Sequence, residues 1–393
     1  MTARTLRGAA LFAAAAALVG FSIHDAGAIP AFARKYQYSC STCHAPFPRL
    51  KPFGAEFAAR GFRLEDPSAE PTRATIDTGD PLLQLMREVP LALRFDAWTS
   101  SKEDEPARWD IESPWVFKAL SGGPVTNRLA YYAYFIIEKN EVVGLEDAWL
   151  QYNKLFGLPV DVVVGQFQVC DPLFKRELRL ERNDYEIFRV RPGHSVTNLT
   201  YDRGVIAAWG APADIDVVLQ VTNGNGIDPP EEGDNFDVDE RKNVSLRLAR
   251  EFGPVRLGAF GYSGREELPG GPRNRTSYIG PDFVAMLGDK LEISLEYLRR
   301  EDDDPYFVGP GATDIVTKGG FAEVQWFPRG QDGRWTLSAL YNKVSSDDEA
   351  AEFENGSVTL NWLLARNARL SLEGERDLRR DATRVSAGIV AAF

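Results

Sequence analysis

Sulfur and imidazole side chains are scarce in this 393-residue sequence, which has 3 Cys, 3 Met and 3 His. Three cysteines cannot cross-link a chain of this length, so a disulfide-stabilised scaffold is excluded. Basic charge is also in deficit, because 45 Lys and Arg stand against 57 Asp and Glu, a formal net charge of −12. Without a basic patch to offset that charge, no nucleic-acid partner is expected. Apolar residues make up 44% of the chain, which is too many for a disordered protein.

Long apolar runs are also lacking, except at the N-terminus. Two arginines precede the run Ala9–Phe21, and three small residues follow it at 26–28, which is the pattern of a cleaved signal peptide. The alternative is a transmembrane anchor, but the run is short and no charged stop follows it. We therefore predict that residues 1–28 are a signal peptide and that the mature chain begins at Ile29, outside the cytoplasm.

One motif with a specific chemistry is present, C-x-x-C-H, formed by Cys40, Cys43 and His44. In c-type haem attachment the two thiols add to the haem vinyl groups, and the adjacent histidine becomes the proximal iron ligand. A zinc site is one alternative, but it needs a fourth ligand, for which Cys170 and His194 are the remaining soft candidates. A redox C-x-x-C pair is the other, and it normally opens a βαβ unit that does not follow here. The motif predicts one covalently attached haem c.

Aromatic and aliphatic residues recur at mostly helical spacing after this motif. They predict a short helix through Pro48 to Arg63, which covers one face of a porphyrin or forms a small hydrophobic core. Residues 29–87 are too few to enclose a haem, so we expect this unit to lean on the rest of the chain. The residues of the stripe are Phe47, Leu50, Phe53, Phe57 and Phe62.

The distal iron ligand has few candidates. Met86 is the nearest in sequence, on the linker before the first strand-like run, and we predict that it is the axial ligand. A thioether ligand would raise the reduction potential. The alternative is that Met86 packs as an ordinary apolar residue. Met286 and His194 remain as the other candidate ligands.

From residue 88 onward the hydrophobic period changes to two, which is typical of β-strands. This alternation also suits a soluble sandwich, so the connections must decide between the two folds. Short turns alternate with longer charged loops, as in outer-membrane barrels, and we count about sixteen strands. The short turns are expected near 122–126, 155–159, 210–213, 252–254, 288–289, 328–333 and 366–368, and longer loops include 227–240, 266–276, 301–313 and 345–354.

These patterns predict an all-β fold, a transmembrane antiparallel β-barrel of about 16 strands over residues 88–393. A small helical c-type haem domain over 29–87 precedes it. The chain ends at Phe393, in a strand-like run with one apolar face, which looks like the C-terminal targeting signal of bacterial outer-membrane proteins. The segment from Gln168 to Asn198 is expected to be either a constriction loop inside the lumen or a surface loop.

The segments 29–34, 40–44 and 47–54 resemble the fused monohaem cytochrome–porins, a family that includes outer-membrane iron oxidases of iron-oxidising bacteria. The barrel resembles that family only in architecture and size. The resemblance implies haem ligation by Cys40, Cys43 and His44, a haem on the periplasmic side at the barrel mouth, and electron transfer across the outer membrane.

Two functions follow as expectations. The first is an outer-membrane electron-transfer protein between an extracellular donor, with Fe(II) as a candidate, and a periplasmic cytochrome c. The second is a diffusion porin whose haem domain acts as a plug or redox sensor. Membrane lipid is a partner in both. The acidic clusters at 234–240, 301–304 and 347–349 would attract Fe(II), or would be solvated charged loops.

Overall fold

The computed structural model describes residues 31–70, 75–80, 83, 85–87, 90–138, 141–170, 176–227, 240–268 and 270–393. The predicted signal peptide, residues 1–28, lies outside the described residues. Most of the acidic cluster at 234–240 does so too. Among the described residues, no helix combines the length and the apolar character needed to span a membrane.

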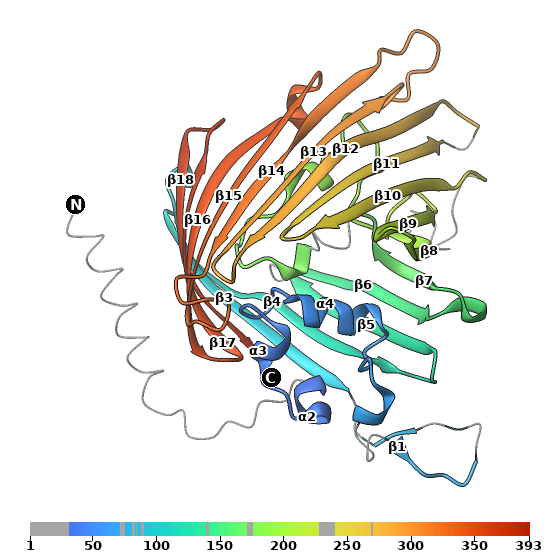
Figure 1. Ribbon diagram of the computed structural model, residues 1–393. Coiled ribbons are helices and arrows are strands. Elements are labelled where there is room, and N and C mark those ends of the chain that lie inside the picture. Colours follow the sequence, from blue (N-terminus) through green and yellow to red (C-terminus); the bar gives the residue numbers. More distant parts are fainter. Residues whose placement is uncertain are drawn as a thin grey trace, which may run out of the picture.

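Sixteen antiparallel strands of the described chain, β3 to β18, close into a barrel in which each strand pairs with the next along the chain (Figure 1). The last strand, β18, pairs with the first, β3, and this pairing closes the barrel. The predicted fold class is therefore confirmed. The strands are β3 (Leu91–Lys102), β4 (Trp109–Pro124), β5 (Leu129–Glu138), β6 (Glu141–Tyr152), β7 (Val160–Gln168), β8 (Tyr201–Ala211), β9 (Ile215–Thr222), β10 (Asn243–Phe252), β11 (Val255–Glu267), β12 (Arg273–Leu287), β13 (Leu291–Asp302), β14 (Ile315–Trp326), β15 (Trp335–Ser346), β16 (Phe353–Ala365), β17 (Ala368–Asp377) and β18 (Ala382–Ala392).

The alternation along the strands is inverted relative to a soluble sandwich. In β10, Asn243, Ser245 and Arg247 are buried, whereas Val244 and Leu246 are 41% and 42% exposed. Polar side chains therefore fill the lumen and apolar side chains cover the outer face. A soluble sandwich buries its apolar face, so this arrangement separates the two folds that the period of two left open.

The two ends of the barrel differ in their connections. At one end, here called the turn end, the connections are 125–128, 153–159, 212–214, 253–254, 288–290, 327–334 and 366–367. At the other, the loop end, longer connections dominate, including 169–200 and 303–314. The connection expected over 266–276 is shorter, because Glu267 and Arg273 still pair across β11 and β12. The first strand begins and the last strand finishes at the turn end, where the amide of Leu93 donates to the carbonyl of Phe393.

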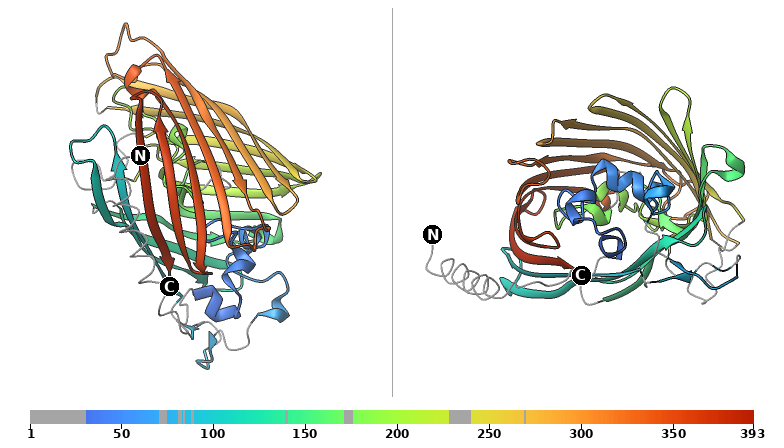
Figure 2. Two further views of the ribbon diagram at one scale, coloured as in Figure 1. Left: turned by 90° about the vertical axis from the view of Figure 1, so that its left-hand side faces the viewer. Right: turned by 60° about the horizontal axis from the view of Figure 1, so that its bottom comes forward.

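The connection 169–200 is here called the constriction loop, and its described residues, 169–170 and 176–200, fold into the lumen (Figure 2). Tyr185 stacks on Phe321 of β14 with ring centroids 4.1 Å apart. Arg369 of β17 donates to the carbonyl oxygen of Leu180 at 2.8 Å. Of the two placements that the sequence left open, the structure has the lumenal one. Short 3₁₀ turns lie within this loop and elsewhere: η2 (Leu155–Gly157), η4 (Arg176–Leu178), η5 (Glu186–Phe188) and η6 (Glu349–Ala351).

The N-terminal segment, residues 31–70, is helical and lies within the ring of strands at the turn end (Figure 2). The helix expected through Pro48 to Arg63 is shorter than predicted. It begins at Pro52, because proline has no N–H and suits only the first helical turn, and Gly61 follows its end with a φ of +68°. The elements are α2 (Ala31–Tyr36), α3 (Cys40–Cys43), α4 (Pro52–Ala59) and η1 (Pro67–Ala69), followed by the hairpin β1 (Thr75–Ile76) and β2 (Leu85–Met86).

Candidate haem-attachment site

The two cysteines of the C-x-x-C-H motif lie on one short helical turn, α3. Ser39 caps its N-terminus, with its hydroxyl accepting from the amide of Ser41 at 3.3 Å. Residues three apart in a helix share a face, so Cys40 and Cys43 present their sulfur atoms together. Both are free thiols with partly exposed side chains, and burial raises the pKa of each. This arrangement suits attachment to two neighbouring groups on one ligand.

His44 follows directly, in an extended conformation, as the C-cap of α3. Its Nδ1 lies 3.0 Å from the carbonyl oxygen of Pro48, and its ring meets Phe47 edge-on with centroids 5.4 Å apart. A metal-binding imidazole usually donates a hydrogen bond from the N–H of its second ring nitrogen to a carbonyl oxygen. Here that nitrogen is Nδ1, which leaves Nε2 for the metal. Burial also lowers the pKa of His44, despite the bonds to backbone carbonyls that raise it, and so favours the neutral form that can ligate.

Helix α4 packs closely against the motif. A Cβ at Gly54 would overlap the carbonyl oxygen of Cys43, so only glycine permits this approach. The same carbonyl accepts from the amide of Lys51 at 2.8 Å. The residues between the two helices are thereby fixed, and the loop that orients His44 is held from both sides.

Charged contacts bind this segment to the barrel wall. Arg49 pairs with Glu292 of β13 and, at 3.1 Å, with Glu323 of β14, and the side chain of Glu323 is 1% exposed. The Nζ atom of Lys51 lies 2.8 Å from Asp332 in the turn between β14 and β15 and 2.6 Å from the carbonyl oxygen of Ser41. Nothing local in the sequence could reveal the partner, since Arg49 and Glu292 are 243 positions apart.

An aromatic contact binds the other side of the segment. Phe62 lies against Tyr132 of β5 and Trp149 of β6, with ring centroids 5.8 and 6.2 Å away. Gly122 of β4 leaves room for them, because a Cβ there would come within 2.9 Å of the Tyr132 ring. Of the predicted stripe, Phe57 and Phe62 belong to a hydrophobic core that Tyr132 and Trp149 of the barrel wall complete, whereas Phe53 is 39% exposed.

The candidate distal ligands lie in three different places. Met86 is in β2, and its sulfur is 3.5 Å from where a Cβ on Gly123 would lie, at the turn end of β4. Met286 is in register with Glu292, the partner of Arg49, and its sulfur accepts from Gln331 at 3.8 Å. Gln331 adjoins Asp332, the partner of Lys51, so Met286 belongs to the charged contact region around the motif.

The third candidate, His194, lies in the constriction loop. Its ring meets Tyr306 with centroids 5.6 Å apart, and its amide donates to the carbonyl of Pro305, in a loop-end connection. Cys170, the other residue considered as a zinc ligand, is 1% exposed among apolar side chains of the same loop. The C-x-x-C-H motif is at the turn end, so neither residue is placed to complete a zinc site there.

The acidic clusters of the loop end are engaged in local structure. Asp304 accepts from the amides of Val308 and Gly309, and Asp348 accepts from those of Gly193 and Ala350. These carboxylates therefore brace loops. The cluster at 234–239 lies outside the described residues.

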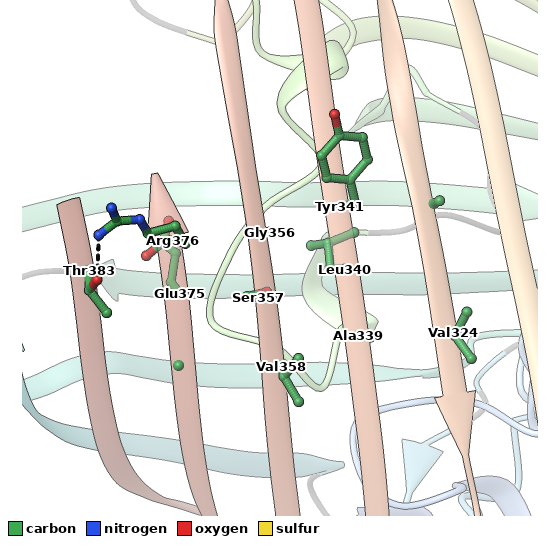
Figure 3. A pocket seen from close by; sticks show the side chains of 12 residues that line it. Val324, Ala339, Leu340, Tyr341, Gly356, Ser357, Val358, Glu375, Arg376 and Thr383 are labelled. Carbon is green, nitrogen blue, oxygen red and sulfur yellow. Dashed lines mark hydrogen bonds between the residues drawn. The ribbon is translucent and has the colours of Figure 1, made fainter. Parts of the chain in front are cut away.

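A groove of about 570 Å³ crosses β14 to β18 (Figure 3). Small residues form its floor and Val324, Tyr341 and Val358 flank it, with Tyr341 and Val358 pointing outward at 40% and 52% exposed. It lies on the outer face of the wall, away from the C-x-x-C-H motif.

Solved structures similar to this chain are outer-membrane proteins. OmpT of Vibrio cholerae in its trimer form aligns with 14% identity and a TM-score of 0.55, over 78% of this chain and 99% of that one. The anion-selective porin from Comamonas acidovorans aligns with 12% identity and a TM-score of 0.56, over 78% and 99%. Salmonella typhi OmpF, in complex with daunomycin, aligns with 9% identity and a TM-score of 0.54, over 77% and 97%. No family model and no curated protein sequence matches this chain.

The fold is therefore that of the outer-membrane porins, a closed antiparallel barrel of sixteen strands. Within that fold, this chain carries an N-terminal segment with a C-x-x-C-H motif docked into the turn end of the barrel.

Proposed function

We propose that this protein is an outer-membrane electron-transfer protein that carries one covalently attached haem c. The electron comes from an extracellular donor, with Fe(II) as the candidate, and passes to a periplasmic cytochrome c. The porin fold supports residence in the bacterial outer membrane. The turn end, with the N-terminal segment, then faces the periplasm, because outer-membrane barrels have short periplasmic turns and longer outer loops.

The geometry of Cys40, Cys43 and His44 carries this proposal. Two thiols on one helical turn and a neutral imidazole held through Nδ1 are the donor set that a haem c requires. Haem would supply one-electron chemistry at its iron. Met86 is the proposed axial ligand, and Met286 is the alternative on the lumen side of the motif. Arg49 and Lys51 hold the motif at the barrel mouth.

A second candidate function is a diffusion porin whose haem domain acts as a plug or redox sensor. The likeness to porins, including an anion-selective one, favours it at the level of the fold. The N-terminal segment covers the turn-end mouth and the constriction loop lies in the lumen, so solute flux would depend on how firmly they are held.

Attachment is tested by replacing the two thiols. We expect Cys40→Ala and Cys43→Ala together to abolish covalent haem staining at the protein's band, while Cys170→Ala leaves the stain intact. Cys170 is the matched control because it is the third cysteine of the chain. Unchanged staining in the double variant would disprove haem attachment at this motif.

The two functions are separated by two measurements on the same protein. Intact cells that express it should oxidise Fe(II) or a reduced dye faster than cells that express the Cys40→Ala, Cys43→Ala variant. Liposomes that contain it should show little solute flux. Rapid flux together with no haem-dependent oxidation would favour the diffusion porin.

A further inference from the structure

A chain of aromatic side chains begins beside the C-x-x-C-H motif. Tyr38, two residues before Cys40, has its ring centroid 6.1 Å from that of Phe53. Phe53 stacks on Phe57 at 6.4 Å, and Phe57 meets Phe62 at 6.1 Å. These contacts lead across α4 to the edge of the N-terminal segment that touches the barrel.

The chain continues into the barrel wall without a gap. Phe62 stacks on Trp149 at 6.2 Å, and Trp149 lies 5.5 Å from Tyr132 across the β5–β6 pair. Tyr132 meets Tyr134 at 5.9 Å, and the hydroxyl of Tyr134 lies 2.6 Å from that of Tyr201, at the start of β8. The last links face the lumen, where Tyr134 is 1% and Tyr201 is 4% exposed.

The far end of this series of aromatic side chains, at Tyr201, lies beside a polar cavity. Tyr201 lines a cavity of about 420 Å³ together with Glu146, Arg176, Arg189 and Arg191. Arg191 is exposed, and Arg189 has 43% of its side chain exposed, so the cavity is reachable from the loop end. A donor that entered from that end would meet Tyr201 before any other member of the chain.

One member has a local proton acceptor. The hydroxyl of Tyr134 donates to the Oε2 atom of Glu146 at 2.9 Å. A phenol that loses an electron becomes strongly acidic, and a carboxylate at this distance can hold its proton until the electron is replaced. Lys118 lies over the same ring, 4.1 Å from its centroid, and the Glu146 carboxylate offsets that positive charge.

We propose that this aromatic chain is the route by which an electron crosses the barrel between the cavity at Tyr201 and the haem at Cys40, Cys43 and His44. A one-electron donor in the cavity is oxidised, and the ferric iron is reduced to ferrous. Each aromatic side chain ends in the state in which it began. A ferric haem c is too weak an oxidant to take an electron from a tyrosine ring, so in this direction the rings bridge the transfer without being oxidised themselves. Only a stronger oxidant, such as the photo-oxidant of the test below, oxidises Tyr134, whose phenolic proton then moves to Glu146 and returns when the ring is reduced. This inference rests on the proposed haem.

The test uses the full-length, haem-loaded protein in liposomes and does not depend on the natural donor. A ruthenium photo-oxidant is attached to Arg191→Cys, at the exposed edge of the cavity, and the haem is reduced beforehand. A flash in the presence of a sacrificial electron acceptor produces Ru(III), which withdraws one electron and leaves the haem ferric. The rate is read from the haem absorbance, and a transient tyrosyl radical is sought by electron paramagnetic resonance.

We expect Tyr134→Phe, and separately Trp149→Phe, to slow haem oxidation about tenfold or more, an increase in barrier of about 1.4 kcal/mol per factor of ten. Tyr134→Phe should also remove the tyrosyl signal, and Glu146→Gln should weaken the dependence of the rate on solvent deuterium. The control is Tyr262→Phe, since Tyr262 and Tyr278 form a separate lumenal pair at 5.6 Å.

Haem absorbance and reduction potential before the flash show whether a variant keeps its site. Unchanged rates in both Tyr134→Phe and Trp149→Phe, or an equal loss in Tyr262→Phe, would overturn the aromatic route while leaving the haem in place. The absence of covalent haem in the parent protein is a different failure, visible by staining, and would overturn the proposed function together with this route.

Discussion

Glu323 is the residue at which two lumenal segments meet. Its carboxylate receives Arg49 from the N-terminal segment at 3.1 Å and the hydroxyl of Tyr185 from the constriction loop at 2.7 Å. A carboxylate that is 1% exposed is costly to bury alone, so the ion pair with Arg49 and the hydrogen bond from Tyr185 both offset the cost of burying Glu323. One side chain of β14 thereby ties a segment of the turn end to a loop of the opposite end.

The identity of the second iron ligand beside His44 is also tested by replacing single residues. We expect Met86→Ala to lower the reduction potential and to remove any thioether-to-iron absorption band, because the bound iron would lose a sulfur ligand. Met286→Ala is the matched comparison, since Met286 lies on the lumen side beside the partners of Arg49 and Lys51. Redox titration and absorption spectra of the two variants measure this. If the band survives in Met86→Ala and disappears in Met286→Ala, the role belongs to Met286.

At the scale of elements, the predictions that succeeded rest on local chemistry. The period of two identifies the strands, because side chains alternate faces in any strand, and the short turns follow from glycine, proline and asparagine at their ends. The helix of the N-terminal segment is predicted too long, since the apolar spacing continues past the residues that end it. Pro52 and Gly61 mark where this helix begins and ends, but the prediction followed the hydrophobic spacing instead of these two residues.

Docking of the N-terminal segment depends on Arg49. We expect Arg49→Gln to weaken docking by about 3–5 kcal/mol, the typical cost of leaving a buried charge without its partner, here Glu323 and Glu292. Hydrogen exchange of the backbone amides of residues 40–62 measures docking and should accelerate strongly.

The control for that measurement is Arg60→Gln in the same segment. Arg60 pairs with Glu56 and Glu65, but all three side chains are at least 39% exposed, and such surface pairs contribute little. Its exchange pattern should stay that of the parent protein. Equal acceleration in both variants, or none in Arg49→Gln, would contradict an anchoring role for Arg49.

For the whole molecule, the sequence predicts the class of fold, the number of strands and the position of the haem motif ahead of the barrel. It does not predict which wall residues receive that motif. The partners Glu292, Trp149 and Asp332 are scattered over strands and turns far from the motif in sequence, and only closure of the barrel brings them to one mouth. The alternating strand pattern alone does not predict which strands of the closed barrel face the N-terminal segment.

Membrane orientation gives the prediction at this scale. An epitope inserted beside Asp348, between β15 and β16, should bind antibody on intact cells, because that connection belongs to the loop end. The same epitope between Arg366 and Asn367, at the turn end, should be reached only after permeabilisation. The opposite pattern would invert the orientation, and no labelling of either site on membranes would argue against an outer-membrane barrel.

The places where the first barrel strand begins and the last one ends also bear on how the protein is assembled. The first strand begins, the last strand finishes and the N-terminal segment docks, all at the turn end. In the proposed orientation, Cys40, Cys43 and His44 never have to pass through the bilayer or thread the lumen. Attachment of the proposed haem would therefore require only the leading segment to be accessible on the periplasmic side, whether or not the barrel that follows it has already closed.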